Sequence, residues 1–80
     1  MKLPRDLRGS ELVKGLQRVG YELTRQQGDH VYLTTLQNGE HHVTVPLHDP
    51  VRVGTLASIL DSVSAHLRME RGELLRAMKL

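Results

Sequence analysis

The chain has no cysteine among its 80 residues, which excludes disulfide bonds, thiolate nucleophiles and cysteine zinc sites. Long hydrophobic runs are also missing. No segment approaches the ~20 apolar residues of a membrane span, and the N-terminus has no apolar stretch typical of a secretory signal. We therefore expect a cytoplasmic protein without membrane association, in a reducing compartment that suits a cysteine-free chain.

Aromatic residues are scarce, with no phenylalanine or tryptophan and only Tyr21 and Tyr32. Base stacking on an aromatic platform, the usual device of single-strand binders, therefore has little to work with. The net charge of +2 is compatible with a polyanionic partner and names none. Basic residues are frequent in the first 25 positions, at Lys2, Arg5, Arg8, Lys14, Arg18 and Arg25. Ordinary solvated surface charge is the alternative explanation of this distribution.

A helix is predicted over residues 11–19. Ser10 suits its N-cap, Glu11 suits the positive end of the helix, and Gly20 supplies a stop. Apolar side chains recur at helical spacing, at Leu12, Val13, Leu16 and Val19. Lys14 and Arg18 lie four residues apart on the polar side, so they present a pair of positive charges to a passing ligand.

After Gly20 the hydrophobic pattern takes the period of two that is typical of strands. The first strand places Tyr21, Leu23 and Arg25 on one side and Glu22, Thr24 and Gln26 on the other. The second places Val31, Leu33 and Thr35 opposite His30, Tyr32, Thr34 and Leu36. A third runs from His41 to Val45 and ends before Pro46.

The apolar faces of the second and third strands determine their register. A three-residue loop at residues 37–39, with Gly39 in the left-handed position, pairs Leu33 with Val43, whereas a two-residue turn mixes the two faces. The three-residue loop gives a sheet with one apolar face and one polar face. The polar face carries His30, Tyr32, Thr34, His42 and Thr44.

A second helix is predicted from Gly54 and Thr55, with Thr55 as its N-cap, to Leu67. Its apolar stripe of Leu56, Ile59, Leu60, Val63 and Leu67 packs on the apolar face of the sheet. After a break near Arg68 and Met69, a short last helix covers about residues 70–78, with Leu74, Leu75 and Met78 facing inward. The sequence thus predicts one domain over residues 1–80, a two-layer α+β fold of order α-β-β-β-α. Two helices cover one face of a three-stranded antiparallel sheet, and a short C-terminal helix follows.

His30 follows a Gly28–Asp29 turn at the start of the second strand. Imidazole has an ordinary pKa of ~6.5, so it both takes and gives a proton near neutral pH. At the mouth of a strand the ring is expected to be exposed, which makes His30 a candidate for acid–base work. The alternative is a polar residue that merely closes a hairpin.

Four stretches of the chain, in their order and spacing, resemble those of a known protein family. They are Ser10–Lys14 with Gly20–Leu23, Arg25–Val31, Val43–Pro46, and Gly54–Leu56 with Ile59–Leu60. Together they resemble the HicA (YcfA-like) family of small mRNA interferase toxins, whose fold is like that of the double-stranded-RNA-binding domain. The family usually has Gly-Ser-His where this chain has Gly28, Asp29 and His30. Helix two also runs on through residues 63–67, where relatives often turn earlier.

The resemblance implies that His30 is the catalytic residue of a metal-independent endoribonuclease, which makes the RNA 2′-hydroxyl attack the adjacent phosphate. It further implies a toxin that cuts mRNA, needs no cofactor and is held silent by a cognate HicB-like antitoxin protein. RNA binding and charge stabilisation fall to Lys14, Arg18, Arg25 or His42, among which the sequence does not choose. A carboxylate at Asp29 favours the protonated ring, and so general acid work or phosphate contact over base work.

A metal site is not expected. His41 and His42 are adjacent in a strand and point to opposite faces. Apart from these two and His30, the chain has only His48 and His66, with no matching carboxylate cluster.

Two other functions compete with the nuclease. One is a module that binds structured RNA through its fold and the basic first helix, with the histidine only contacting phosphate. The other is a DNA-reading helix-turn-helix formed by residues 55–67 and 70–78. The last helix offers only Arg71, Arg76 and Lys79 beside Glu70 and Glu73, so DNA binding by this chain alone is disfavoured.

Overall fold

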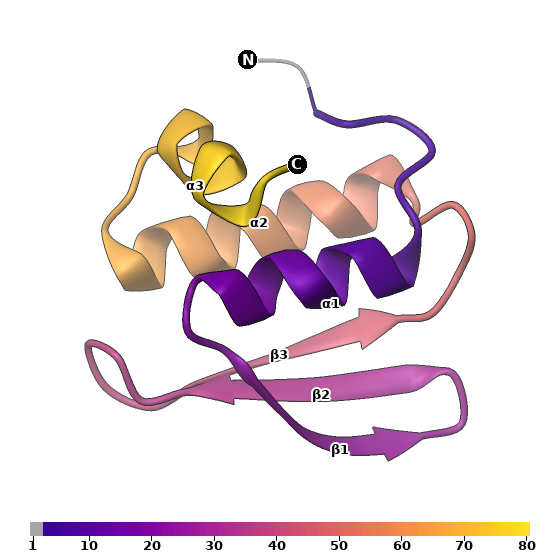
Figure 1. The fold of residues 1–80 in the computed structure, drawn as a ribbon, viewed down its shortest axis with the longest axis horizontal. Helices are drawn as coiled ribbons and strands as arrows, with labels where there is room; N and C mark the ends of the chain where they lie inside the picture. Colours follow the sequence, from indigo (N-terminus) through magenta and orange to yellow (C-terminus); the bar gives the residue numbers. More distant parts are fainter. Residues whose placement is uncertain (1–2) are drawn as a thin grey trace.

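A computed structural model describes residues 3–80. Its elements are α1 (Gly9–Arg18), β1 (Glu22–Gln27), β2 (His30–Thr35), β3 (His41–Pro46), α2 (Val53–Leu67) and α3 (Arg71–Met78). The strands form one antiparallel sheet in the order β1-β2-β3, and all three helices lie on the same side of it (Figure 1). The predicted α+β fold with its short C-terminal helix is confirmed. Within residues 3–80 no helix combines the length and the apolar character needed to cross a membrane.

The core lies between the sheet and the helices. Leu12 and Leu16 of α1, Leu33 of β2 and Leu60 of α2 are all fully buried. The predicted inward side chains of α3 are confirmed as well, because Leu74, Leu75 and Met78 belong to the same buried cluster.

The register of the second hairpin is as predicted. Leu33 pairs with Val43, Tyr32 with Thr44, and Thr34 with His42. Gly39 has a φ of 100° and so takes the predicted left-handed position, and Asn38 beside it also has a positive φ of 57°. The two faces of the sheet therefore separate as expected, with an apolar face under the helices and a polar face open to solvent.

The first strand departs from the prediction at Thr24. Leu23 pairs with Leu33 but Arg25 pairs with Tyr32, so the register shifts by one residue between them. Thr24 is the extra residue of this β-bulge, and its Oγ1 donates a hydrogen bond to the carbonyl oxygen of Tyr32 at 3.2 Å. A bulge turns the following side chain to the other face. Arg25, predicted on the side of Leu23, lies instead on the polar face.

The predicted N-caps Ser10 and Thr55 are wrong, because the N-cap of α1 is Arg8 and that of α2 is Arg52. The helices therefore begin at Gly9 and Val53. Tertiary contacts take the place of a hydroxyl cap on α1. The Gly9 amide donates to the carbonyl oxygen of His48 at 3.2 Å. A Cβ on Gly9 would lie 2.8 Å from Cα of Leu47, so glycine permits a close approach that only the folded chain reveals.

The helix ends match the prediction more closely. The first helix ends at Arg18, one residue before the predicted Val19. The second ends at Leu67 as predicted, and Arg68 stops it in the left-handed conformation, with a φ of 56°. Glu70 is the N-cap of α3. The break near Arg68 is thus a C-cap.

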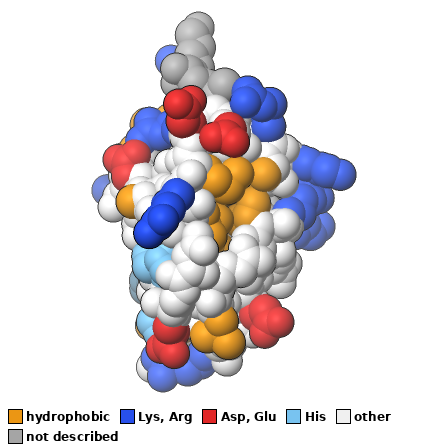
Figure 2. All heavy atoms as spheres, turned by 90° about the vertical axis from the view of Figure 1, so that its left-hand side faces the viewer, with side chains coloured by type: hydrophobic (Ala, Val, Ile, Leu, Met, Phe, Trp, Pro, Cys, Tyr) orange, Lys and Arg blue, Asp and Glu red, His pale blue; other side chains and the backbone are white. Residues whose placement is uncertain are grey.

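A pair of stacked histidines fastens the β2–β3 loop to α2. The rings of His41 and His66 are 4.4 Å apart between centroids and nearly parallel at 12°. Nε2 of His66 lies 2.7 Å from the carbonyl oxygen of Gln37 and 3.0 Å from that of Gly39. Both partners are acceptors, so this nitrogen is the donor. Figure 2 views the end of the molecule that carries this loop and shows imidazoles along one flank.

His41 continues this network into the core. Its Nδ1 lies 2.7 Å from the hydroxyl of Tyr21, and its Nε2 lies 3.0 Å from Oγ of Ser62. Tyr21 is 1% exposed, and its burial raises the pKa of the phenol to about 12. Burial, followed by the neighbouring His66 and His42, lowers the pKa of His41. In the neutral ring one of these nitrogens donates and the other accepts, and the hydroxyls of Tyr21 and Ser62 can complement either arrangement.

Candidate functional site

The candidate histidine begins β2 directly after a tight turn. Gln27 pairs with His30, so Gly28 and Asp29 form a two-residue hairpin turn. Gly28 has a φ of 59°, and positive φ at the first turn position is the type II′ arrangement, which favours glycine. A Cβ on Gly28 would meet no atom within 4 Å. Backbone conformation, and not space, is therefore the reason for glycine.

This turn is anchored to the third strand. The amide of Leu47 donates to the carbonyl oxygen of Asp29 at 2.6 Å, which extends the ladder that pairs His30 with Pro46. His30 therefore belongs to the central strand and has backbone partners on both sides. Its side chain is still 51% exposed, and its Nδ1 lies 3.2 Å from Oδ1 of Asp29.

Arg25 is the predicted basic residue that the fold brings beside His30. The bulge sets it on the polar face, paired with Tyr32, and the next pair along that face is Gln27 with His30. The guanidinium carbon lies 4.5 Å from the ring centroid of Tyr32. Nη2 of Arg25 donates to Oε1 of Gln27 at 3.3 Å. Two neighbours thus hold the guanidinium near the imidazole.

His42 lies on the same polar face but farther away. It pairs with Thr34, four residues along β2 from His30, which is about 13 Å at the rise of a strand. Its Nδ1 lies 2.8 Å from Oγ1 of Thr34, and its Nε2 lies 2.8 Å from a carboxylate oxygen of Glu40. Because both ring nitrogens have partners, the position of His42 is explained as a cross-strand neighbour of Thr34.

Lys14 and Arg18 lie in the helix layer and not with His30. They line a hollow of about 230 Å³ with Glu11, Lys79 and Leu80. Nη1 of Arg18 donates to the carbonyl oxygen of Met78 at 3.1 Å, so this side chain satisfies the C-terminal end of α3. Holding α3 in place is a structural reason for Arg18.

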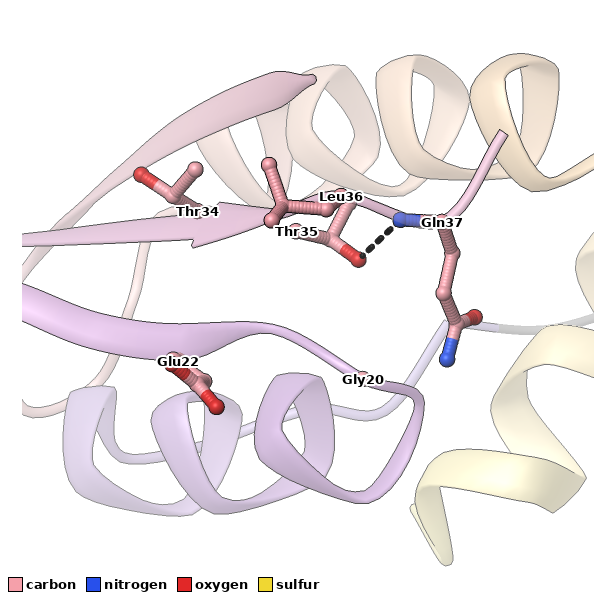
Figure 3. Close-up of a pocket in the computed structure, with 6 residues that line it drawn as sticks. All are labelled: Gly20, Glu22, Thr34, Thr35, Leu36 and Gln37. Carbon is pink, nitrogen blue, oxygen red and sulfur yellow. Dashed lines mark hydrogen bonds between the residues drawn. The ribbon is translucent and has the colours of Figure 1, made fainter. Parts of the chain in front are cut away.

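A second hollow, of about 380 Å³, opens where β1 departs from β2. It is lined by Gly20, Glu22, Thr34, Thr35, Leu36 and Gln37 (Figure 3). At the rim of this hollow the backbone amide of Gln37 donates a hydrogen bond to Oγ1 of Thr35 at 3.2 Å. The lining contains no imidazole and no cation, so this hollow is not the place for the predicted chemistry.

The histidines and carboxylates of the described residues do not form a metal centre. Among residues 3–80, no group of three histidine, aspartate or glutamate side chains is arranged to hold an ion. The rings of His41 and His66 are stacked, but their nitrogens are hydrogen-bonded to Tyr21, Ser62 and backbone carbonyl oxygens.

The arrangement can supply two chemical functions. An exposed imidazole with a carboxylate at one nitrogen can move a proton at the other, and a nearby guanidinium can stabilise developing negative charge. Both lie on an open sheet face, which admits a polymer chain more readily than it encloses a small molecule. The sequence predicted roles for His30 and Arg25 separately. Their shared face, and the position of Arg25 over the Tyr32 ring, result from the bulge, which the sequence did not predict.

Comparison with known proteins adds one positive finding. No match was found among curated proteins or among solved structures. The family model described as HicA toxin of bacterial toxin-antitoxin matches residues 9–64, from the start of α1 almost to the end of α2. That span is more than half of the chain and includes His30, Asp29 and Arg25. The chain therefore belongs to the HicA toxin family of bacterial toxin–antitoxin systems.

Proposed function

We propose that this toxin is an endoribonuclease that cleaves mRNA without a metal ion, with His30 as its catalytic residue. The observation that carries the proposal is the half-exposed His30 ring at the anchored turn, with Asp29 at Nδ1 and Arg25 on the same sheet face. The proposed chemistry uses only proton transfer at His30 and charge stabilisation by Arg25. Membership of a toxin–antitoxin family implies a cognate antitoxin, and we propose a HicB-like protein that covers the face carrying His30.

The proposed reaction is a transesterification within the RNA. Nε2 of His30 accepts the proton of a 2′-hydroxyl, whose oxygen forms a bond to the adjacent phosphorus. The bond from phosphorus to the 5′-oxygen breaks, and that oxygen takes a proton from water. The hydroxide left behind takes the proton from Nε2 of His30, which returns the ring to its neutral form. The products are a 2′,3′-cyclic phosphate and a 5′-hydroxyl. The sequence predicts that Asp29 directs His30 toward acid work. In the proposed step the same carboxylate, 3.2 Å from Nδ1, instead stabilises the positive charge that the ring gains as a base.

Arg25 is the best-placed side chain to stabilise the phosphate in this reaction. Its guanidinium is held by Gln27 and Tyr32 near His30, and guanidinium edges match phosphate oxygens. His42 lies farther along the same face, where we propose that it contacts the same strand of RNA. Lys14 and Arg18, in the helix layer, are within reach only of RNA that continues around the molecule.

The test is cleavage of RNA by purified protein in the presence of EDTA. His30→Ala is expected to reduce the rate by about 10²- to 10⁴-fold, the usual contribution of a general acid or base. His48→Ala is the matched control, because His48 is also exposed but lies in the loop after β3. Equal rates for the wild type and His30→Ala, with unchanged thermal melts, would contradict the catalytic role.

A second candidate function is a non-catalytic RNA-binding module. The observation that favours it is Asp29, a carboxylate in a position where the resembled family usually has serine. On this reading the wild type binds RNA and does not cut it, and Asp29→Ser is expected to restore cleavage. Cleavage by the wild type that depends on His30 eliminates this candidate.

A further inference from the structure

We propose that Arg25 and Tyr32 together form a stacking subsite for one unpaired nucleobase, next to His30 on the polar face of the sheet. This inference deepens the proposed function, because it rests on RNA as the substrate and names the form of RNA that fits. It concerns the base, whereas the catalytic role of His30 concerns the sugar and the phosphate.

The first support is the position of Tyr32. Of the two tyrosines, Tyr21 is buried in the core at 1% exposure, whereas Tyr32 lies on the polar face and is only partly covered. Tyr32 is two positions after His30 along β2, so both side chains point to the same side, about 7 Å apart along the strand. Within residues 3–80, Tyr32 is the aromatic ring that faces solvent beside the candidate catalytic residue.

The second support is the way in which Arg25 covers this ring. Its guanidinium carbon lies 4.5 Å from the Tyr32 centroid, and Arg25 itself is exposed. One side of the guanidinium therefore contacts the ring and the other side is open to solvent. Planar guanidinium groups stack on nucleobases as aromatic rings do. Nη2 of Arg25 donates to Gln27, and the guanidinium has five N–H donors in all. Its other donors remain for phosphate, so stacking by its face does not compete with charge stabilisation.

The third support is the bulge at Thr24. In a regular strand the side chain of Arg25 would point toward the helices, on the same side as Leu23. The register shift reverses it, and the Thr24 hydroxyl, bonded to the carbonyl oxygen of Tyr32, joins the bulge to the residue that Arg25 covers. Bulges re-aim side chains at functional sites in this way.

The form of RNA follows from this geometry. A base inside a duplex is stacked on both sides and offers no free face, whereas an unpaired base can turn out and stack on Arg25. One guanidinium over one tyrosine ring offers a stacking surface for one base. The subsite thus takes one base of a single-stranded segment and holds its sugar and phosphate near His30.

The experiment measures binding of two hexamers that cannot be cleaved, because their 2′-oxygens are methylated. One is an oligoadenylate and the other is an abasic strand of the same length and charge. One stacked base contributes roughly 1–3 kcal/mol, so the wild type is expected to bind the adenylate about 10-fold more tightly. Tyr32→Ala and Arg25→Lys are expected to bind both strands about equally.

Tyr32→Phe is the matched control, because it keeps the ring and is expected to keep the preference for the adenylate. It also supplies a second readout. Tyrosine fluorescence should fall when the adenylate binds the wild type, and this change should be absent from Tyr32→Phe although binding persists. Equal affinity of the wild type for both strands, or a preference that survives Tyr32→Ala and Arg25→Lys, overturns the subsite.

These results are separate from the fate of the proposed nuclease. A preference for bases that depends on Tyr32, in a protein that does not cut RNA, keeps the subsite and removes the catalytic role of His30. Cleavage that depends on His30, with no preference for bases over the abasic strand, keeps the nuclease and removes the subsite.

Discussion

Replacing Tyr21 with phenylalanine tests the network between the core and the stacked histidines. The ring is retained, so the packing of this 1%-exposed side chain is conserved and only the hydroxyl is lost. Near neutral pH that hydroxyl is hydrogen-bonded to Nδ1 of His41 at 2.7 Å. Loss of the bond is expected to reduce the free energy of unfolding by about 1 kcal/mol. In a domain of this size that lowers Tm by roughly 4–8 °C.

The same substitution has the opposite effect in alkaline solution. Burial raises the pKa of Tyr21 to about 12, whereas a tyrosine in the unfolded chain titrates near ~10. The unfolded state therefore loses its proton first as the pH rises. The stability linked to this proton is complete below about pH 10 and is lost as the pH rises through about 12, at roughly 1.4 kcal/mol per unit. Phenylalanine carries no such proton.

The two effects predict a crossing of the stability curves. Tyr21→Phe is expected to be less stable than the wild type at about pH 7.5, equal to it near about pH 11, and more stable at about pH 12, because roughly 1 kcal/mol is offset within the first unit above ~10. Urea unfolding followed by far-ultraviolet circular dichroism at several pH values measures the difference. Tyr32→Phe is the control, since Tyr32 is partly exposed. A difference between Tyr21→Phe and the wild type that stays constant with pH would refute the reasoning.

Two more predictions concern other parts of the fold. Because the pKa of His41 is lowered in the folded protein, the unfolded chain takes up the proton first on acidification. The part of the folding stability that is linked to His41 is therefore fully present above about pH 6.5 and is lost as the pH falls below that value. His66→Gln, which removes the neighbouring imidazole, should make the acid limb of a urea-unfolding series shallower, and an unchanged slope would count against the coupling. Arg68 ends α2 with a φ of 56°, so Arg68→Gly is expected to stabilise the protein by about 0.5–1 kcal/mol and raise Tm; a lower Tm in calorimetry would show that the arginine side chain contributes more than its backbone strain costs.

Much of the fold was predictable because its periodic elements are regular. The alternation of Val31 and Leu33 with polar neighbours, together with the Val43 pattern, determined the register of the second hairpin. The inward face of α3 followed in the same way from Leu74 and Leu75. In these segments local periodicity and tertiary packing favour the same structure, so the pattern alone was sufficient.

The predictions that were wrong depended on contacts between distant segments. The start of α1 at Gly9 depends partly on a distant contact, because the Gly9 amide is satisfied by the carbonyl oxygen of His48. A local bond from the Arg8 amide to Oε1 of Glu11 also places the N-cap at Arg8 and not at Ser10. The bulge at Thr24 was also hidden, since the alternation of Tyr21, Leu23 and Arg25 is that of a regular strand. Leu23 is 44% exposed, so burial does not impose the regular register on this edge strand.

In the candidate site, too, some features follow from the local sequence and others only from the folded chain. His30 was identifiable from its turn and from the resemblance, and its placement at the start of β2 follows directly. Which cation accompanies it was not identifiable, because Arg25, His42, Lys14 and Arg18 differ in their distance from His30 only once the chain has folded. The structure favours Arg25 on position. A role of any of these residues in RNA binding stays a prediction.

The edge position of β1 gives the two halves of the site unequal local stability. All six residues of β1 are exposed and the strand has one neighbour in the sheet, whereas β2 lies between two strands. Local openings begin in segments with few buried contacts, so amide hydrogens of β1 should exchange with solvent sooner than those of β2. When β1 frays, Arg25 leaves the site while His30 stays in place. If RNA is the substrate, as proposed, a bound strand that holds Arg25 would slow that exchange, and ligand binding would then add rigidity to the edge of the sheet.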